Sequence, residues 1–307
     1  MTNPGKTIRL YLVNGSPTDI LTAEVINWTG KVIVAPRTQL GELAAREEVR
    51  RTGVYCLVGP DPDNPLRETV YFGEADNVLT RLTVHDKDET KDFWTRCAVV
   101  ISKDQNITKA HGRYLETRLI AIAAQADRAK VHNGTAPATP SLPEPDVADM
   151  EYFLGQIQLV LPVLGFQFLQ PKPNASLPDG DPATQKSPLF SLSVGGATAT
   201  AREIQGEFIV LKGSTARKEG LKSWISYKAL RDQLLQEGQL TDSSDSNLLV
   251  FKEDVAFSSP SAAGAVVNAG NINGRTAWKT PTGQTYAAWH ESKIAYASGG
   301  EARAGSR

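Results

Sequence analysis

The sequence GVYCLVGPDPDNPLRETVYFG, residues 53–73, predicts a β-hairpin. Its two ends, 53–58 and 69–72, are apolar runs of strand length that are rich in β-branched and aromatic residues. The segment between them consists largely of Gly, Pro, Asp and Asn, the residues that form turns. We therefore expect two adjacent antiparallel strands joined by a long loop.

The residues that follow this hairpin predict further elements of a small α/β unit. Residues 74–77 offer side chains that can cap a helix, and a short helix is expected directly after them. A third strand is expected at 94–101, and either Asn106 or Thr108 can cap a long helix that runs to about residue 129. The order strand, strand, helix, strand, helix places this unit at residues 49–133.

The rest of the chain divides by composition. Residues 1–48 predict a β-rich N-terminal extension, and 134–188 form a Pro-rich linker with one helix at about 147–161. A second, small α+β domain is expected at 189–290, and the small polar residues of 291–307 predict a disordered tail.

Composition and charge exclude several classes of protein. The formal net charge of -1 excludes a polybasic, histone-like protein, and two cysteines are too few for a disulfide scaffold or a zinc site built mainly from Cys. The longest apolar run, 159–166, is far shorter than the roughly twenty residues needed to cross a membrane. The N-terminus lacks the apolar core of a secretory signal. We expect a cytoplasmic protein with no membrane partner.

Arg81 and His85 are the first candidates for a functional site. They lie four residues apart on the short expected helix and so share one face. A guanidinium beside an imidazole suits a phosphate or another anion. The same spacing also fits a solvated helix face, and spacing alone does not separate these two interpretations.

Glu116 is the second candidate, because it lies beside the buried stripe of the long expected helix. A carboxylate in that position either pairs at the edge of solvent, with Arg113 as the nearest cation, or binds a specific partner such as a metal ion. Both interpretations remain open at the level of sequence.

Two tyrosine-containing triplets give these residues a context. Gly53-Val54-Tyr55 and Tyr71-Phe72-Gly73 resemble the paired signature of the GIY-YIG nuclease family, although Val54 and Phe72 stand where that signature has isoleucine. Arg81, Glu116 and Asn133 follow in the order of the family's remaining motif residues, with Asn133 the candidate for its closing asparagine. His85 stands where some restriction-type members have a histidine. The resemblance covers about 51–133, and the loop between the triplets is longer than in the shortest members.

The resemblance implies a fold, a reaction and a cofactor. It implies a small three-stranded, mainly antiparallel sheet flanked by helices, within a chain of mixed α/β (α+β) class. Glu116 would hold one divalent ion, Mg²⁺ or Mn²⁺, and Arg81 would clamp the phosphate that is cleaved. Tyr55 or His85 would act as the general base, with Tyr71 in support, and Gly53 and Gly73 would shape the strands. The choice between Tyr55 and His85 stays open.

The expected C-terminal domain contains a local excess of positive charge. Residues 212–231 hold six cations against one acid, with two aromatic residues among them. That composition suits a phosphate backbone with stacked bases, but it also fits a solvated surface. The candidate nucleic-acid-binding residues are Lys212, Arg217, Lys218, Lys222, Trp224, Tyr227, Lys228 and Arg231. Residues 259–279 resemble a C-terminal domain of unknown function that often follows GIY-YIG modules, and this resemblance implies no activity.

Taken together, these observations predict a divalent-metal-dependent endonuclease that hydrolyses the phosphodiester bonds of duplex or single-stranded DNA. The alternative is a non-catalytic DNA-binding or regulatory protein that retains the same fold. A protein that only binds DNA has no need of a metal-binding carboxylate, so metal-dependent turnover separates the two.

Overall fold

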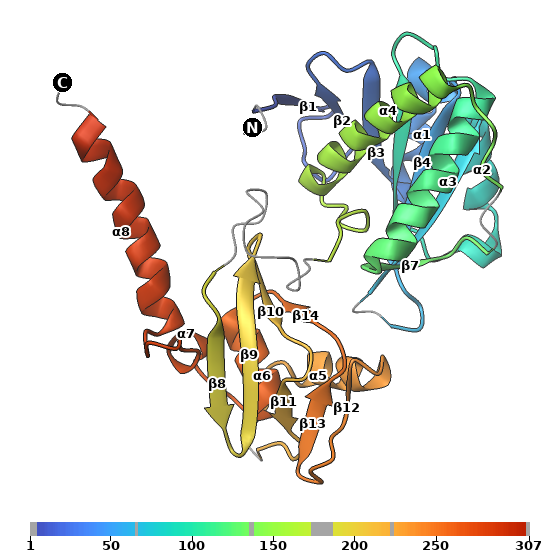
Figure 1. Ribbon diagram of the computed structural model, residues 1–307. Coiled ribbons are helices and arrows are strands. Elements are labelled where there is room, and N and C mark those ends of the chain that lie inside the picture. Colours follow the sequence, from blue (N-terminus) through green and yellow to red (C-terminus); the bar gives the residue numbers. More distant parts are fainter. Residues whose placement is uncertain (1–4, 65–66, 135–137, 173–186, 222–223, 305–307) are drawn as a thin grey trace. The chain divides into compact units, whose positions relative to one another are not determined.

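The computed structural model describes residues 5–64, 67–134, 138–172, 187–221 and 224–304. It divides into two compact units, Met1–Lys172 and Pro173–Arg307, each of mixed α and β structure (Figure 1). No helix in the described ranges is long and apolar enough to cross a membrane.

A seven-stranded sheet forms the centre of the first unit, in the order β1-β2-β3-β6-β4-β5-β7. All neighbouring strands are antiparallel except β5 and β7, which run parallel. The strands are β1 (Ile8–Leu12), β2 (Leu21–Val25), β3 (Gly30–Pro36), β4 (Gly53–Pro60), β5 (Glu68–Ala75), β6 (Arg96–Ser102) and β7 (Ala129–Val131).

This sheet corrects the expected three-stranded core with a separate β-rich extension. Strand β3 pairs with β6 along its whole length, from Gly30↔Ser102 to Pro36↔Arg96, so the N-terminal strands continue the central sheet. Its residues Val32 to Ala35 are all buried, as expected for an inner strand covered on both faces. A short apolar run does not reveal which strand it will pair with, because pairing is decided by tertiary contacts.

Helices cover both faces of this sheet. One face packs against α3 (Lys109–Ala126) and α4 (Glu144–Val163), and the other against α1 (Leu40–Leu43) and α2 (Val78–Asp86). Alternation along β4 decides the faces: Val54, Cys56 and Val58 join the core under α3, whereas Tyr55 and Leu57 join the core under α2. The 3₁₀ segments are η1 (Arg37–Gln39), η2 (Glu47–Arg50) and η3 (Glu89–Lys91).

Helix α4 corrects the expected linker. Its residues Phe153, Leu154 and Ile157 are almost fully buried in the core that α3 also covers, so the helix belongs to the first unit. The segment 173–186, where the rest of the expected linker lies, is outside the described residues. Thr108, one of the two expected caps, begins α3 by accepting a hydrogen bond from the His111 N–H.

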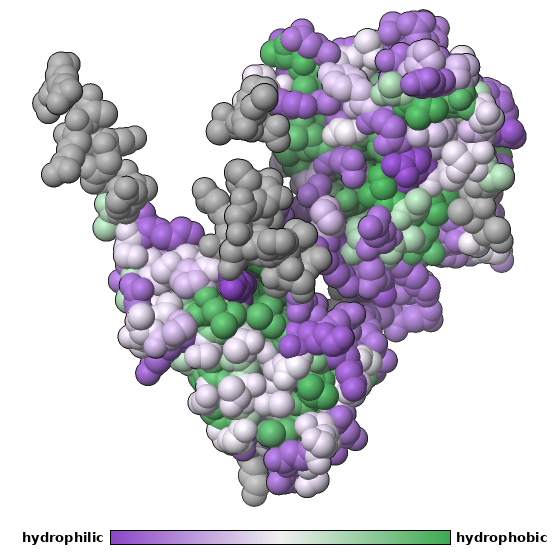
Figure 2. All heavy atoms as spheres, in the orientation of Figure 1, coloured by the Kyte–Doolittle hydropathy of each residue, from purple (hydrophilic) through white to green (hydrophobic). Residues whose placement is uncertain are grey.

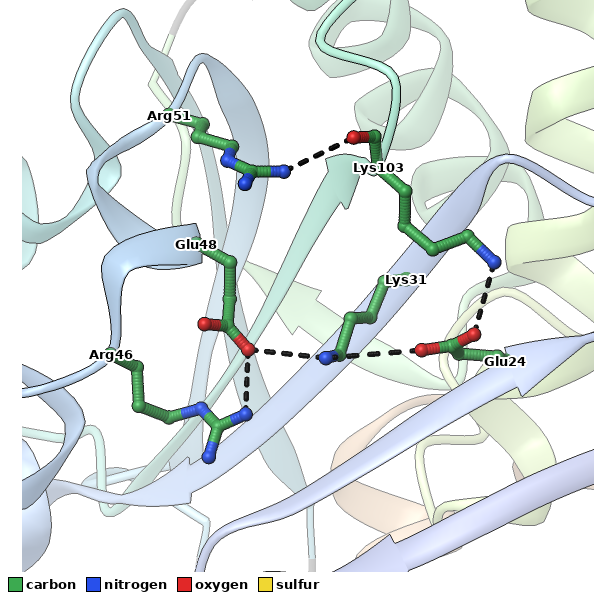
Figure 3. Close-up of polar contacts among 6 residues, drawn as sticks. All are labelled: Glu24, Lys31, Arg46, Glu48, Arg51 and Lys103. Carbon is green, nitrogen blue, oxygen red and sulfur yellow. Dashed lines mark hydrogen bonds and ion pairs between the residues drawn. The ribbon is translucent and has the colours of Figure 1, made fainter.

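A row of ion pairs ties β2, β3 and η2 together at the surface (Figure 3). Glu48 accepts from Arg46 at 2.6 Å and from Lys31 at 3.1 Å, while Glu24 accepts from Lys103 at 3.0 Å. Lys31 also lies 3.8 Å from Glu24 and so links the two carboxylates. These charges are largely satisfied by one another, which favours a structural role.

The second unit has its own core between two small sheets. One sheet has the order β14-β10-β9-β8 and the other β11-β13-β12, with α6 packed against strands of both. The strands are β8 (Phe190–Val194), β9 (Ala197–Ile204), β10 (Glu207–Val210), β11 (Thr215–Arg217), β12 (Leu240–Asp242), β13 (Leu248–Phe251) and β14 (Val255–Phe257). The helices are α5 (Lys228–Gln236), α6 (Pro260–Asn268), α7 (Gly274–Ala277) and α8 (Tyr286–Ala304).

Helix α8 corrects the expectation of a disordered tail from residue 291, because it continues to Ala304. On the visible face of each unit, hydrophilic and hydrophobic residues are interspersed (Figure 2), as is usual for a water-exposed protein surface. Both cysteines, Cys56 and Cys97, are free and buried, and burial raises the pKa of each thiol to about 12.

Candidate active site

The candidate site lies beside strand β5, beyond the point where its parallel neighbour ends. Strand β7 pairs with β5 only at Glu68–Val70. At Phe72 the edge of β5 is hydrogen-bonded by a side chain instead of a strand. The Asn133 carboxamide donates to the Phe72 carbonyl at 2.8 Å and accepts from the Phe72 N–H at 2.9 Å. Asn133 therefore closes the paired part of this edge, and the next residues, from Gly73 to Ala75, border a pocket.

The pocket has a volume of about 510 Å³ and is lined from three directions. Strands β4 and β5 contribute the tyrosines, α2 contributes Arg81, and α3 contributes Glu116. Five residues singled out from the sequence thus line one pocket: Tyr55, Tyr71, Gly73, Arg81 and Glu116. His85, Gly53 and Asn133 support it from outside its lining.

Tyr55 and His85 form a buried hydrogen-bonded pair. The Tyr55 hydroxyl lies 2.8 Å from His85 Nε2, and the two residues are 2% and 1% exposed. Burial raises the pKa of Tyr55, and the neighbouring Tyr71 adds to this effect. Burial, helped by Arg81 and Lys91, lowers the pKa of His85 to about 4. Near neutral pH the pair is therefore a phenol beside an uncharged imidazole, and only the phenol faces the pocket.

Gly73 makes room for this arrangement. A Cβ atom at Gly73 would overlap the hydroxyl and the ring of Tyr55, which pairs with it across the two strands. The glycine of the second triplet is therefore required by the packing of the tyrosine of the first. Gly53, the first glycine, packs against the Val100 carbonyl of β6 in the same way.

Arg81 brings a positive charge to the mouth of the pocket. It projects from α2, which Asn77 caps by accepting a hydrogen bond from the Thr80 N–H at 3.1 Å. Burial lowers the pKa of Arg81, but interactions with the hydroxyls of Tyr55 and Tyr71 outweigh that effect, so the net shift is upward. The guanidinium remains charged and partly exposed, as binding of an anion requires.

Glu116 reaches the pocket from the opposite side of β5. Burial raises the pKa of its carboxyl group to about 7, and the nearby Glu74 adds to the rise against the opposing effects of Arg113 and Arg81. Arg113, the partner that the sequence suggested for Glu116, lies 3.6 Å from Glu74 instead. Half of the carboxyl population would therefore be protonated near neutral pH, which is unusual for a glutamate.

Glu74 lines the pocket and Gly112 packs against its side chain, although neither residue was singled out from the sequence as part of a site. Glu74 follows Gly73 on β5, and the period of two places it on the same face as Val70 and Phe72, both of which are buried. The alternating pattern of β5 in the sequence already placed this acidic residue on the same strand face as two core residues, and it could have identified Glu74. Gly112 offers no such signal, because its role depends on the packing of α3 against β5.

The side chains of this pocket that could bind a metal ion are carboxylates. In the described ranges, no group of three or more His, Cys, Asp or Glu side chains is arranged to hold an ion. Glu116 and Glu74 both line the pocket, however, and one Glu74 oxygen is buried without a hydrogen-bond partner in the described structure. A hard cation such as Mg²⁺ takes one or two carboxylates and keeps several waters, so this donor set fits it.

The basic residues predicted to bind nucleic acid in the second unit differ in burial and in their partners. Arg231 is 3% exposed and donates to the carbonyls of Val266 and Lys218, each at 2.9 Å, and to that of Arg217. Its guanidinium is therefore occupied by the protein. Lys218 pairs with Asp242 at 2.6 Å, and Arg217 donates to Asn268.

The remaining candidates of that segment lie nearer to solvent. Lys228 and Trp224 line a second hollow of about 600 Å³ together with Lys218, and Tyr227 is 42% exposed at the start of α5. Lys212 donates its backbone N–H to Asp254, and Lys222 is outside the described residues. Lys218, Lys228 and Arg231 thus line one hollow, but the guanidinium of Arg231 is engaged by carbonyl groups of the protein.

A comparison with protein families gives a match within the second unit. Residues 190–290 match the family described as a domain of unknown function, DUF4357. This range begins at β8 and ends within α8. No curated protein and no solved structure matches the chain.

Proposed function

We propose that this protein is a divalent-metal-dependent endonuclease of the GIY-YIG type, which hydrolyses phosphodiester bonds of DNA. The observation that carries the proposal is the pocket beside β5, where Tyr55, Tyr71, Arg81 and Glu116 meet although they come from separate elements. Two phenols, a guanidinium and a half-buried carboxyl group can together supply proton transfer, charge stabilisation and a metal ligand for phosphodiester hydrolysis.

Arg81 would bind the phosphate that is cleaved. Its charge does not depend on pH in the physiological range, and its planar donors match two phosphate oxygens. The contact strengthens as negative charge grows on the phosphate in the transition state, so it lowers the barrier for the reaction itself. The partly exposed position of Arg81 leaves the guanidinium accessible to a DNA strand.

Tyr55 and His85 would share the removal of a proton from the attacking water. Tyr55 lines the pocket, whereas His85 lies behind it and reaches the pocket only through the 2.8 Å contact with the phenol. The Tyr55 hydroxyl oxygen would take the proton from water as the hydroxyl passes its own proton to His85 Nε2. The imidazole is uncharged near neutral pH and can accept that proton, but burial lowers its pKa to about 4 and so makes it a weak base. This assignment gives both candidates for the general base a role.

Glu116 would hold the metal ion. A bound Mg²⁺ or Mn²⁺ supplies Lewis-acid stabilisation of the oxygen that leaves. The carboxyl group must be ionised to bind a cation, and the cation itself favours ionisation, so the raised pKa of Glu116 is expected to fall when the ion is present.

The test is cleavage of duplex, nicked, branched and single-stranded DNA, and of RNA, by the purified protein with and without Mg²⁺. Glu116→Ala and Arg81→Ala should each abolish cleavage. Gln125→Ala, on the exposed side of α3, and Arg50→Ala, at the exposed last residue of η2, serve as controls and should cleave normally.

The alternative is a DNA-binding or regulatory protein without turnover. It predicts that the wild-type protein binds DNA but leaves every substrate intact at all Mg²⁺ and Mn²⁺ concentrations. Cleavage by Glu116→Ala or Arg81→Ala at the wild-type rate would refute the assignment of these residues.

A further inference from the structure

Glu74 is a largely buried carboxylate of the pocket lining to which the proposed reaction assigns no role. It lies on β5 directly after Gly73, and its side chain is only 13% exposed. Its neighbours on the same face, Val70 and Phe72, belong to the apolar core under α3. Burying a carboxylate among such residues costs free energy unless the charge is paired, so this position needs an explanation.

The partners of Glu74 within the protein do not satisfy it. Glu74 Oε2 is buried and has no hydrogen-bond partner in the described structure. Arg113 Nε lies 3.6 Å from Oε1, which is beyond hydrogen-bond length, and the Arg113 side chain is 59% exposed. Native proteins rarely leave a buried carboxylate oxygen unpaired, which indicates that a further group belongs beside it.

Gly112 lets Glu74 lie against the helix that carries Glu116. A Cβ atom at Gly112 would lie 3.4 Å from Glu74 Cβ and 3.7 Å from Oε2, so the side chain of Glu74 lies against the helix at this glycine. Glu116 follows Gly112 by four residues and thus projects from the same face of α3 one turn later. Both carboxylates line the same pocket, and the charge of Glu74 disfavours ionisation of Glu116.

A divalent cation resolves both features at once. It neutralises the repulsion between the two carboxylates and supplies the missing partner of Glu74. Mg²⁺ and Mn²⁺ are suited to this role because they prefer oxygen ligands and accept two carboxylates while keeping water molecules for the remaining positions.

We propose that Glu74 is a second carboxylate ligand of the divalent cation that Glu116 holds. The inference rests on the proposed function, since it concerns the same ion, but it assigns a residue from β5 that the motif set leaves out. The ion is then held between a strand and a helix, so its position depends on the packing of α3 against β5.

The experiment measures binding of Mn²⁺ alone by isothermal titration calorimetry, with the full-length chain in the absence of DNA, and repeats it with a phosphorothioate duplex. Glu74→Gln keeps the shape of the side chain and removes its charge. We expect it to weaken Mn²⁺ binding on the order of ten-fold or more, comparable to Glu116→Gln. Asp76→Asn is the matched control, because Asp76 lines the same pocket but pairs with Lys109 at 2.9 Å. That control should bind Mn²⁺ with wild-type affinity.

Folding is checked by circular dichroism and by thermal unfolding in EDTA, where removal of an unpaired buried charge should leave the midpoint unchanged or raise it. Glu74→Asp provides a second variant that keeps the carboxylate but shortens its reach, and it should bind Mn²⁺ more tightly than Glu74→Gln. Wild-type affinity in folded Glu74→Gln overturns the inference, and so does a wild-type protein that binds no Mn²⁺ in either setting. If Glu74→Gln weakens Mn²⁺ binding but the wild-type protein cleaves no substrate, the proposed nuclease function fails and the metal site stands.

Discussion

At the scale of single residues, burial decides how the pair Tyr55 and His85 can act. The imidazole is the better proton acceptor in solution, but it is 1% exposed and has no direct access to the pocket. The phenol has that access, but burial raises its pKa. Burial also lowers the pKa of the imidazole to about 4. The hydrogen bond joins the accessible phenol to the buried imidazole, so neither is expected to function alone.

His85→Gln tests this coupling. Glutamine can accept the hydrogen bond from Tyr55 but cannot take up its proton, so we expect cleavage to fall by about 10²-fold or more while the fold is kept. Single-turnover cleavage rates with Mg²⁺ provide the measurement. His132→Gln is the control, since this ring also lies near Tyr71, at 6.4 Å, outside the pocket lining. Equal rates in His85→Gln and the wild type would rule out a proton-accepting role.

The lowered pKa of His85 also has a consequence for stability. The folded protein binds this proton only near pH 4, whereas an unfolded chain binds it near pH 6.5. The contribution of the neutral imidazole is therefore complete above about pH 6.5 and is lost as the pH falls towards 4.

Gly73→Ala tests the close approach of Tyr55 to β5. The new methyl group overlaps the phenol, so we expect a loss on the order of 1–3 kcal/mol in the free energy of unfolding together with loss of cleavage. Urea unfolding is the measurement. Gly155→Ala, in α4 with open space around its Cβ position, should instead stabilise the protein by about 0.5–1 kcal/mol. A Gly73→Ala protein as stable and active as the wild type would show that the phenol does not need this space.

At the scale of secondary-structure elements, the ion pairs around Glu48 connect η2 to the sheet. Burial acts to raise the pKa of Glu48, but hydrogen bonds from its own backbone, from Arg46 and from Lys31 outweigh it and hold the pKa at about 2 (Figure 3). Residue Val49 beside it is fully buried against the core under α2, so the ion pairs fix a segment that the core already anchors.

Glu48→Gln is therefore expected to change how stability depends on pH. Because the folded-state pKa is lowered, the stabilisation is present above about pH 4.5 and is lost as the pH falls to about 2. We expect Glu48→Gln to cost on the order of 1–2 kcal/mol at pH 7, after allowance for solvent screening, and much less at pH 3. Urea unfolding at both pH values measures the difference, with the exposed neighbour Glu47→Gln as control. An equal loss at both pH values would assign the effect to packing.

At the scale of the whole molecule, each unit has a core of its own. The second unit is built around buried residues such as Phe190, Phe208 and Trp278, which pack with α6. Arg231 belongs to this construction, because its guanidinium joins α5 to the carbonyls that follow β11 and to α6. Burial lowers its pKa, because the charged guanidinium is shielded from water.

Arg231→Met tests this structural role. Loss of the hydrogen bonds leaves buried carbonyls without a partner, and we expect a cost on the order of 2–4 kcal/mol. Differential scanning calorimetry should show a lower unfolding temperature for the second unit, with unchanged Mn²⁺ binding in the first. Lys228→Met, an exposed cation on the same helix, should leave the unfolding temperature unchanged. An unchanged unfolding temperature for Arg231→Met would indicate that Arg231 is not structural.

The sequence by itself determined the local elements of this protein. The hairpin of β4 and β5, the cap of α2 at Asn77 and the long helix α3 all follow from residues that are near one another in the chain, because turns, caps and periodicity are local effects. The order of Tyr55, Tyr71, Arg81 and Glu116 along the chain is also visible in the sequence. Each of these residues lies on an element that the local pattern predicts.

Only the tertiary structure decided what lies beside what. The pairing of β3 with β6, the inclusion of α4 in the first core and the placement of Glu74 and Glu116 in the lining of one pocket join residues that are far apart in the sequence. Such contacts depend on which apolar faces find each other during folding, and the pattern of one segment does not specify its partner. The burial of His85 and of Arg231 likewise depends on tertiary contacts, and their charge and spacing in the sequence did not predict it.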